Sequence, residues 1–189
     1  MLEVTLTWSE VMQAAQVGVL RQVQNLRLQR EPRYGAGDAG GWEKNIVGTL
    51  GEMAVAKWLN QFWSGALGDL KAADVGLLQI RATVHGTHLL LHPADADEQI
   101  FILVTGLPPV LRLCGWCRGR EGKQQRYWRD LAGGRPAYCV PQAALRAMAQ
   151  ISRLRAEEKF APVSPGPAVP AAPRAPLVAV PLQRKLFRS

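Results

Sequence analysis

The chain has 189 residues, of which 48% are hydrophobic and 20% are charged, a balance typical of one packed globular domain with additional segments. Its formal net charge of +8 predicts attraction to polyanions such as nucleic acids, and acidic lipids would be drawn by the same charge. No run approaches the roughly 18 apolar residues of a membrane span, the N-terminus lacks a signal-peptide pattern, and the three cysteines are too few and odd in number for a secreted disulfide framework. We therefore expect a cytoplasmic protein with no membrane partner.

Two helices are predicted in the first third of the chain. Apolar residues recur at helical spacing through residues 9–30, and Ser9 is the predicted N-cap. A glycine-rich break follows, and a second helix is predicted at residues 42–63.

The second predicted helix carries a carboxylate among apolar residues. Gly48 and Glu52 fall on one stripe with apolar neighbours, and this stripe is expected to face a sheet. Gly48 and Gly51 would let the helix approach another backbone closely. Because an inward-facing glutamate is costly unless a cation meets it, Glu52 is expected to have a cationic partner, and a metal ion is one option.

Strands are predicted in residues 71–117, and a polar, basic loop in residues 118–138. The expected strands are residues 71–74, 77–84, 88–92, 100–105 and 110–116. A last helix is predicted at residues 141–158, with Pro141 near its start. In the strand at residues 77–84, Leu78, Ile80 and Ala82 share one face and Gln79 and Arg81 the other.

The composition changes near residue 160. Seven of the thirteen prolines lie between Pro162 and Pro181, mixed mostly with alanine and valine, and the chain ends in the basic run LQRKLFRS. Such a segment cannot build a core. We expect one domain at residues 1–159 and a disordered tail at residues 160–189, whose basic end is a candidate for binding a protein partner or nucleic acid.

Three short motifs together resemble the PD-(D/E)XK nuclease superfamily. They are the helical run GTLGE, which ends at Glu52, the aspartate Asp74 in ADVG, and the strand run Gln79-Ile80-Arg81. Their order along the chain, rather than any one of them, carries the resemblance. It implies a restriction-endonuclease-like α/β fold, in which helices flank a mixed central sheet of four or five strands. The chain is also similar overall to small proteins of phages and prophages.

The resemblance implies a metal-dependent nuclease that hydrolyses DNA. Asp74, Gln79, the backbone carbonyl of Ile80 and Glu52 would hold Mg²⁺ or Mn²⁺, hard cations that prefer oxygen ligands. The ion would activate a water and neutralise charge on the phosphate. Arg81 would clamp that phosphate, so the implied catalytic residues are Glu52, Asp74, Gln79 and Arg81.

A second interpretation keeps the fold without the chemistry. Arginine stands at position 81 where the family pattern has lysine, and arginine cannot lose a proton to help deprotonate water. The alternative function is therefore a catalytically degenerate module that binds nucleic acid or a protein partner without cleaving it.

The basic loop is the leading candidate for nucleic-acid contact. Cationic side chains can bind phosphates, and aromatic rings can stack on unpaired bases. The candidate residues are Arg118, Arg120, Lys123, Arg126, Tyr127 and Trp128. The same loop also reads as a solvated segment whose tryptophan folds back onto the core.

The cysteines offer a third interpretation. Cys114 and Cys117 form a CxxC pair, but a structural zinc site needs further ligands, and only Cys139 and histidines at positions 85, 88 and 92 remain. Buried, unreactive cysteines are the favoured reading, with a zinc or redox site as the alternative.

Overall fold

The computed structural model describes residues 1–29, 40–65, 74–130 and 136–151. The helices are α1 (Trp8–Arg27), α2 (Gly40–Trp58) and the single turn α3 (Gly119–Gly122). The strands are β1 (Leu2–Thr5), β2 (Leu78–Thr83), β3 (His88–Leu91), β4 (Ile100–Leu107), β5 (Val110–Arg118), β6 (Trp128–Asp130) and β7 (Pro136–Pro141). Two 3₁₀ turns occupy Gln125–Tyr127 and Gln142–Ala144.

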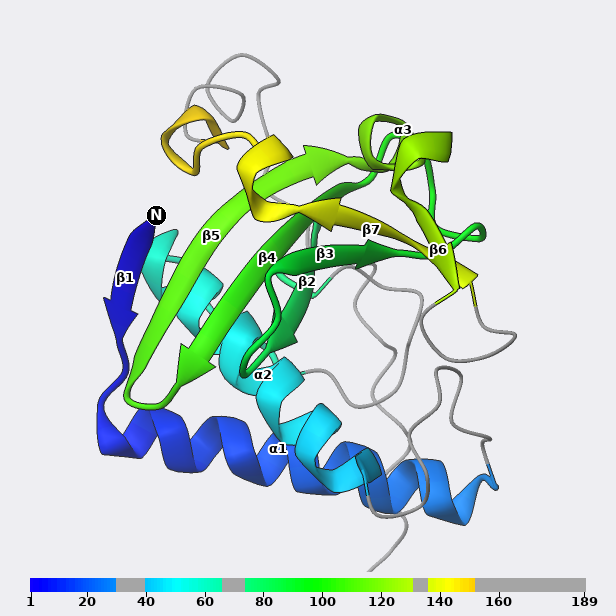
Figure 1. Ribbon diagram of the computed structural model, residues 1–189. Coiled ribbons are helices and arrows are strands. Elements are labelled where there is room, and N and C mark those ends of the chain that lie inside the picture. The colour runs from blue at the N-terminus through cyan, green and yellow to red at the C-terminus, as the bar shows by residue number, and fades with distance from the viewer. Residues whose placement is uncertain (30–39, 66–73, 131–135, 152–189) are drawn as a thin grey trace, which may run out of the picture.

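The strands form two sheets. The central sheet has the order β1-β5-β4-β2, with antiparallel pairs except for β2 and β4, which run parallel (Figure 1). A parallel pair needs a crossover, and here the crossover passes through β3, which belongs to the second sheet. That sheet is antiparallel and has the order β3-β7-β6.

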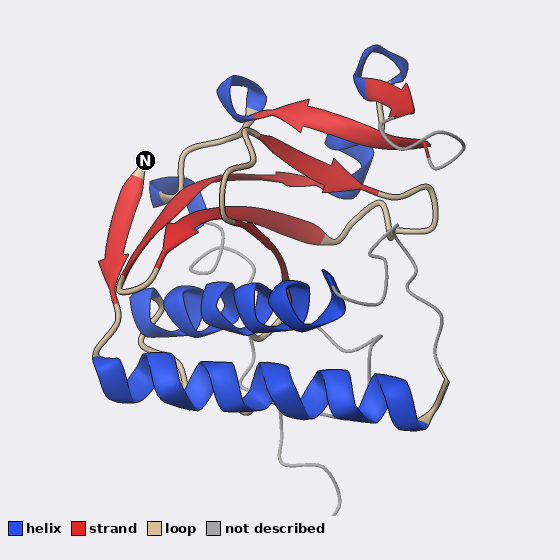
Figure 2. Cartoon of the chain, turned by 60° about the horizontal axis from the view of Figure 1, so that its bottom comes forward, coloured by secondary structure: helices blue, strands red, loops and turns tan. Residues whose placement is uncertain are grey.

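The predicted fold class is confirmed, since the chain is mixed α/β with a four-stranded mixed sheet and helices packed on it. The helices, however, cover only one face of that sheet. The second sheet covers the other face (Figure 2). Side chains of β4 show why, because Ile100, Ile102 and Val104 join the core beneath the helices, while Phe101 and Leu103 join the core between the sheets. Both faces of the sheet are apolar and both are covered.

Helix α2 lies between α1 and the central sheet (Figure 2). Its residues 49–56 are all buried, as expected of a helix that has neighbours on opposite sides. Gly51 faces the sheet, where a Cβ atom would lie 2.6 Å from Cβ of Ala82. The close approach to α1 is made by Gly18, where a Cβ would lie 2.6 Å from Cα of Ile46. The close contact expected at Gly48 is wrong, because nothing lies within 4 Å of a Cβ built there.

The boundaries of both long helices differ from the predicted ones. The N-cap of α1 is Thr7, not Ser9, because Thr7 and Glu10 form a reciprocal capping box. Helix α2 ends at Trp58 rather than at residue 63, and two residues later Asn60 adopts a positive φ of 50°. A left-handed residue of this kind terminates a helix.

Four of the predicted strands are confirmed as β2, β3, β4 and β5. Three strands were not predicted. Strand β1 is only four residues long, and β6 and the first residues of β7 fall in the region expected to be a polar loop at residues 118–138. Residues 71–73 of the weakest predicted strand lie outside the described residues, and Asp74 is at a bend.

The prediction of a helix from residue 141 is wrong for its first part. Pro141 ends β7, which pairs with β3, and a 3₁₀ turn follows. Arg146 then pairs with Trp116 of β5 through two backbone hydrogen bonds of 2.8 and 3.0 Å. These tertiary hydrogen bonds override the local helical pattern, and within the described part of the predicted helix, residues 141–151, α-helix is present at residues 149–151 alone. The rest of the predicted helix, the predicted domain boundary at residue 159 and the tail lie outside the described residues.

Candidate functional site

Glu52 is buried on α2, and its cationic partner is Arg21 of α1. The residue is only 4% exposed. Arg21 donates from Nη1 to Oε1 at 2.5 Å and from Nη2 to Oε2 at 2.9 Å, and the indole nitrogen of Trp63 donates to Oε2 at 3.1 Å. The expectation that Glu52 needs a cation is therefore confirmed, and both carboxylate oxygens are occupied by protein donors.

Asp74 lies at the edge of β2 that does not pair with β4. Its Oδ2 accepts a hydrogen bond of 2.6 Å from the backbone N–H of Ile80, and its own N–H donates to the carbonyl of Leu78. Burial raises the pKa of Asp74 to about 6, and the negative charge of Glu52 adds to the increase. The two carboxylates predicted from the sequence are thus close enough to interact.

Gln79 and Arg81 project from the opposite face of β2. Their neighbour Ile80 packs beneath α2, against the position of Gly51. Side chains alternate along a strand, and in the parallel register Gln79 lies beside Phe101, which belongs to the core between the two sheets. The side chains of Gln79 and Arg81 therefore lie on the face of β2 opposite to α2 and Glu52, whereas Asp74, at the strand edge, is close enough to feel the charges of both Glu52 and Arg81.

Arg81 has a partner that sequence reasoning missed. Its Nη2 donates to Oδ1 of Asp95 at 3.1 Å, and its guanidinium lies 5.2 Å from the ring centre of Phe101. Asp95 also accepts from the backbone N–H of His92 at 2.9 Å. The only signal for this pair was the acidic run DADE that begins at Asp95. The guanidinium proposed to clamp phosphate is paired within the protein.

The predicted metal ligands do not fit a divalent cation as they are arranged. Mg²⁺ requires several oxygens in octahedral geometry. The N–H of Ile80 bonds Asp74 at the free edge of β2. Because the N–H and C=O of one strand residue point to the same side, the carbonyl of Ile80 lies at this edge as well. Glu52, however, gives both oxygens to Arg21 and Trp63, and Gln79 is on the other face of the strand. Among the described residues no cluster of three or more His, Cys, Asp or Glu could hold a metal ion.

The raised pKa of Asp74 predicts a pH-dependent stability. Because the folded pKa lies near 6 and the ordinary value is 3.8, the folded state binds the proton more tightly, and stability falls as pH rises from about 4 to 6. We expect Asp74→Asn, which keeps an oxygen for Ile80, to be more stable than the wild type by about 3 kcal/mol at pH 7.5, and by about 1 kcal/mol at pH 4.5. Urea unfolding in EDTA at both pH values measures this. The exposed Glu43→Gln on α2 is the control, and an equal effect of Asp74→Asn at both pH values would contradict the assignment.

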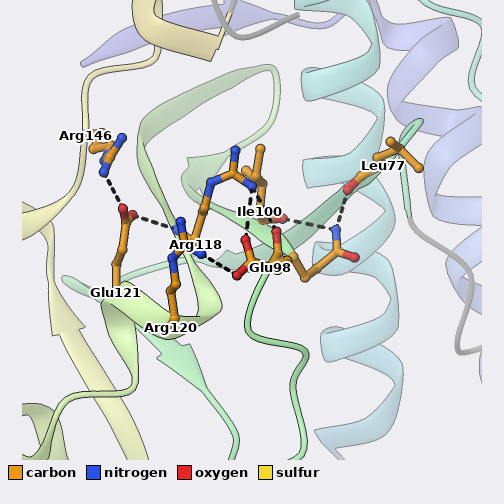
Figure 3. A network of polar contacts seen from close by, with 8 residues as sticks. Leu77, Glu98, Ile100, Arg118, Arg120, Glu121 and Arg146 are labelled. Atoms are coloured by element: carbon orange, nitrogen blue, oxygen red, sulfur yellow. Dashed lines mark hydrogen bonds and ion pairs between the residues drawn. The ribbon is translucent and has the colours of Figure 1, made fainter. Parts of the chain in front are cut away.

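Half of the predicted nucleic-acid surface is paired with acids of the loop before β4, and Figure 3 shows two of these residues, Arg118 and Arg120, against Glu98. Arg118 donates a hydrogen bond of 3.2 Å to the carbonyl of Glu98, and its guanidinium lies 3.8 Å from the Glu98 carboxylate. Arg120 makes an ion pair with the same carboxylate. Lys123 donates to Oδ1 of Asp97 at 2.9 Å. The side chains of Arg118 and Lys123 are only 17% and 15% exposed. These three cations therefore stabilise the loop before β4 through its acidic residues.

Two of the three remaining residues of the surface, Arg126 and Tyr127, border a hollow of about 400 Å³. The guanidinium of Arg126 lies 4.7 Å from the ring centre of Tyr127. The lining residues are His88, Arg126, Tyr127, Arg129, Cys139 and Pro141. Trp128 does not line it, because its ring packs edge-on against Tyr138 with centroids 4.7 Å apart. Arg129, which lines the hollow, was not among the predicted contact residues.

The cysteines are buried and unlinked. Burial raises the pKa of Cys117 to about 12 and also raises the pKa of Cys139. Thiols with raised pKa are poor nucleophiles and poor metal ligands, which favours a structural role for Cys117 and Cys139, and Cys114 is buried as well.

Comparisons with protein families, curated proteins and solved structures find no match to this chain. Within the described ranges, neither long helix combines the length and apolar character needed to cross a bilayer.

Proposed function

We propose that this chain is a DNA-binding protein that does not cleave DNA. It is the degenerate form of the nuclease-like arrangement that its motifs resemble. The observation that carries this proposal is the pairing of Glu52, since Arg21 supplies the positive charge that a metal ion would otherwise supply. A guanidinium cannot activate water as a metal does.

The distribution of charge and aromatic rings supports DNA as the ligand. The hollow beside Arg126, Tyr127 and Arg129 combines exposed cations with a ring able to stack on a base. The described residues have 12 Lys and Arg against 10 Asp and Glu, a net charge of +2. Residues 152–189 have seven Lys and Arg against two Glu, a net charge of +5. Most of the attraction to phosphates is therefore assigned to the C-terminal segment. As a separate part of the proposal, we place the protein in the cytoplasm.

A metal-dependent nuclease is the competing function, and one observation favours it. Asp74 and the Ile80 carbonyl share the free edge of β2, and the charge of Glu52 on α2 acts on Asp74. Rotation of Arg21 away from Glu52 would free that carboxylate for Mg²⁺ or Mn²⁺.

A cleavage assay distinguishes these functions. The full-length protein is incubated with linear, nicked and branched DNA in Mg²⁺, Mn²⁺ or EDTA, beside Asp74→Ala. We expect the DNA to be retained in a mobility-shift gel and to stay intact in every condition. Cleavage that needs the metal and is lost in Asp74→Ala would replace our proposal with the nuclease.

A binding assay tests the proposed surface. Fluorescence anisotropy with a labelled single-stranded oligonucleotide should show that Arg126→Ala/Arg129→Ala binds about tenfold more weakly, with a salt dependence reduced by about two phosphate contacts. Arg112→Ala, which removes an exposed cation on β5, is the matched control and should bind as the wild type does. Replacing Arg184, Lys185 and Arg188 by glutamine should reduce the salt dependence further. If neither set of substitutions weakens binding, the proposed surface is wrong.

A further inference from the structure

The outward side of α1 carries a second apolar stripe. The buried positions Ala14, Gly18 and Gln22 form the stripe that packs on α2. About 100° around the helix lies a second line of apolar side chains, most of them exposed. Trp8 is 71% exposed, and the larger members all have more than a third of their surface in solvent. The stripe consists of Trp8, Met12, Ala15, Val19, Val23 and Leu26.

This stripe is unusual for the surface of a helix because it is continuous and uncharged. Helix α1 has only three charged residues, and two of them, Glu10 and Arg21, pair with Lys57 and Glu52 on α2. A helix that lies on an acidic membrane needs lysines or arginines beside its apolar face. Only Arg27, in the last turn, meets that description. The chemistry of the stripe suits another neutral, apolar protein surface.

The stripe is also close to symmetric about its centre. If a two-fold axis passes between two copies of α1 at the level of Val17, Trp8 of one copy lies opposite Leu26 of the other, and Met12 lies opposite Val23. Ala15 lies opposite Val19, so that small side chains occupy the point of closest approach. Self-complementary surfaces of this kind form isologous dimers.

We propose that the outer stripe of α1 binds the same stripe of a second copy of this chain, with the two helices antiparallel. Helix α1 is the outermost layer of the fold, and α2 separates it from the sheet (Figure 2), so two helices of about 30 Å can meet along their length. The arrangement places no like charges opposite each other. This inference does not depend on the proposed DNA binding.

The exposed area is sufficient for a reversible dimer. Trp8 alone offers on the order of 150 Å², and the whole stripe about 500 Å² per copy, near the lower end of specific interfaces. A dissociation constant on the order of micromolar is expected at this size.

Light scattering after size exclusion tests the dimer at protein concentrations from about 1 to 200 µM. The full-length wild type should change from one-copy to two-copy mass across this range. Val19→Glu should keep the one-copy mass, because it buries a charge in the centre of the interface. Gln13→Glu, an exposed position on another side of α1, is the control and should dimerise like the wild type. A wild type that stays at one-copy mass, or a Val19→Glu variant that dimerises as readily, overturns the proposal.

Disulfide trapping tests the orientation and does not depend on the folding of Val19→Glu. Ala15→Cys and Val19→Cys proteins are mixed and oxidised, with the wild type as the background for its three buried thiols. An antiparallel pair predicts mostly the mixed disulfide between the two variants. Val19→Cys linked mainly to itself would show a parallel arrangement, and no link above background would show that the stripe is not an interface. Either result contradicts the proposal.

Discussion

Arg21→Met should lower the free energy of unfolding by about 3 kcal/mol. The substitution leaves the carboxylate of Glu52 buried with only the indole N–H of Trp63 as a donor. Methionine preserves most of the packing volume of arginine, so the loss reports the missing charge rather than a cavity. Urea unfolding at pH 7.5 measures the change.

A double substitution of the same pair separates the effect of charge on stability from the effect of packing. Arg21→Met/Glu52→Gln removes both charges and keeps an oxygen for Trp63, so its stability should lie closer to the wild type than that of Arg21→Met alone. Arg27→Met, an exposed arginine one turn and a half further along α1, is the matched control and should change stability by less than about 0.5 kcal/mol. A double variant as unstable as Arg21→Met would mean that the pair is not what stabilises this region.

Adding Mg²⁺ to these variants also bears on the proposed function. If the edge of β2 can bind a metal once Arg21 is gone, Arg21→Met should become more stable in Mg²⁺ while the wild type does not. We expect no such difference, because Gln79 remains on the other face of the strand.

Gly18→Ala should destabilise the protein by about 2–3 kcal/mol, whereas Gly48→Ala should stabilise it by about 0.5–1 kcal/mol. A methyl group at position 18 would lie 2.6 Å from Cα and 2.8 Å from N of Ile46, and backbone atoms cannot yield as the end of a flexible side chain can. The two helices would have to separate. At Gly48 a methyl group meets nothing, and alanine has the higher helix propensity.

Thermal unfolding followed by circular dichroism compares the two glycine variants directly. Both substitutions make the same chemical change in a helix, so propensity favours alanine equally, and opposite signs can arise only from packing. A Gly18→Ala variant as stable as the wild type would show that α1 and α2 do not approach at this point.

The site separates what local pattern can predict from what it cannot. Alternation along residues 77–84 placed Ile80 on one face of a strand and Gln79 and Arg81 on the other, and the structure agrees. The same pattern could not indicate which face α2 would cover. The need of Glu52 for a cation was also predictable, because burial of a lone carboxylate is costly. That the cation is Arg21 was not predictable, since 31 residues separate the two in sequence.

The largest error in the fold has a tertiary cause. The predicted helix from residue 141 had adequate periodicity, but β7 pairs with β3, and Arg146 pairs with Trp116 of β5. Those partners lie far away in the sequence, and their hydrogen bonds outweigh a preference of a few tenths of a kcal/mol per residue. Strands β1 and β6, with four and three residues, are too short to have a periodic signal of their own.

The sequence by itself determined the α/β class, both long helices, four strands, the buried state of Glu52 and the concentration of positive charge near the C-terminus. Each of these follows from the spacing or composition of neighbouring residues. Only the tertiary structure decided that both helices lie on one face, that Arg21 neutralises Glu52, that acids before β4 bind half of the basic loop, and that one side of α1 has no partner among the described residues. These depend on contacts between residues distant in sequence, which local propensity and periodicity do not encode.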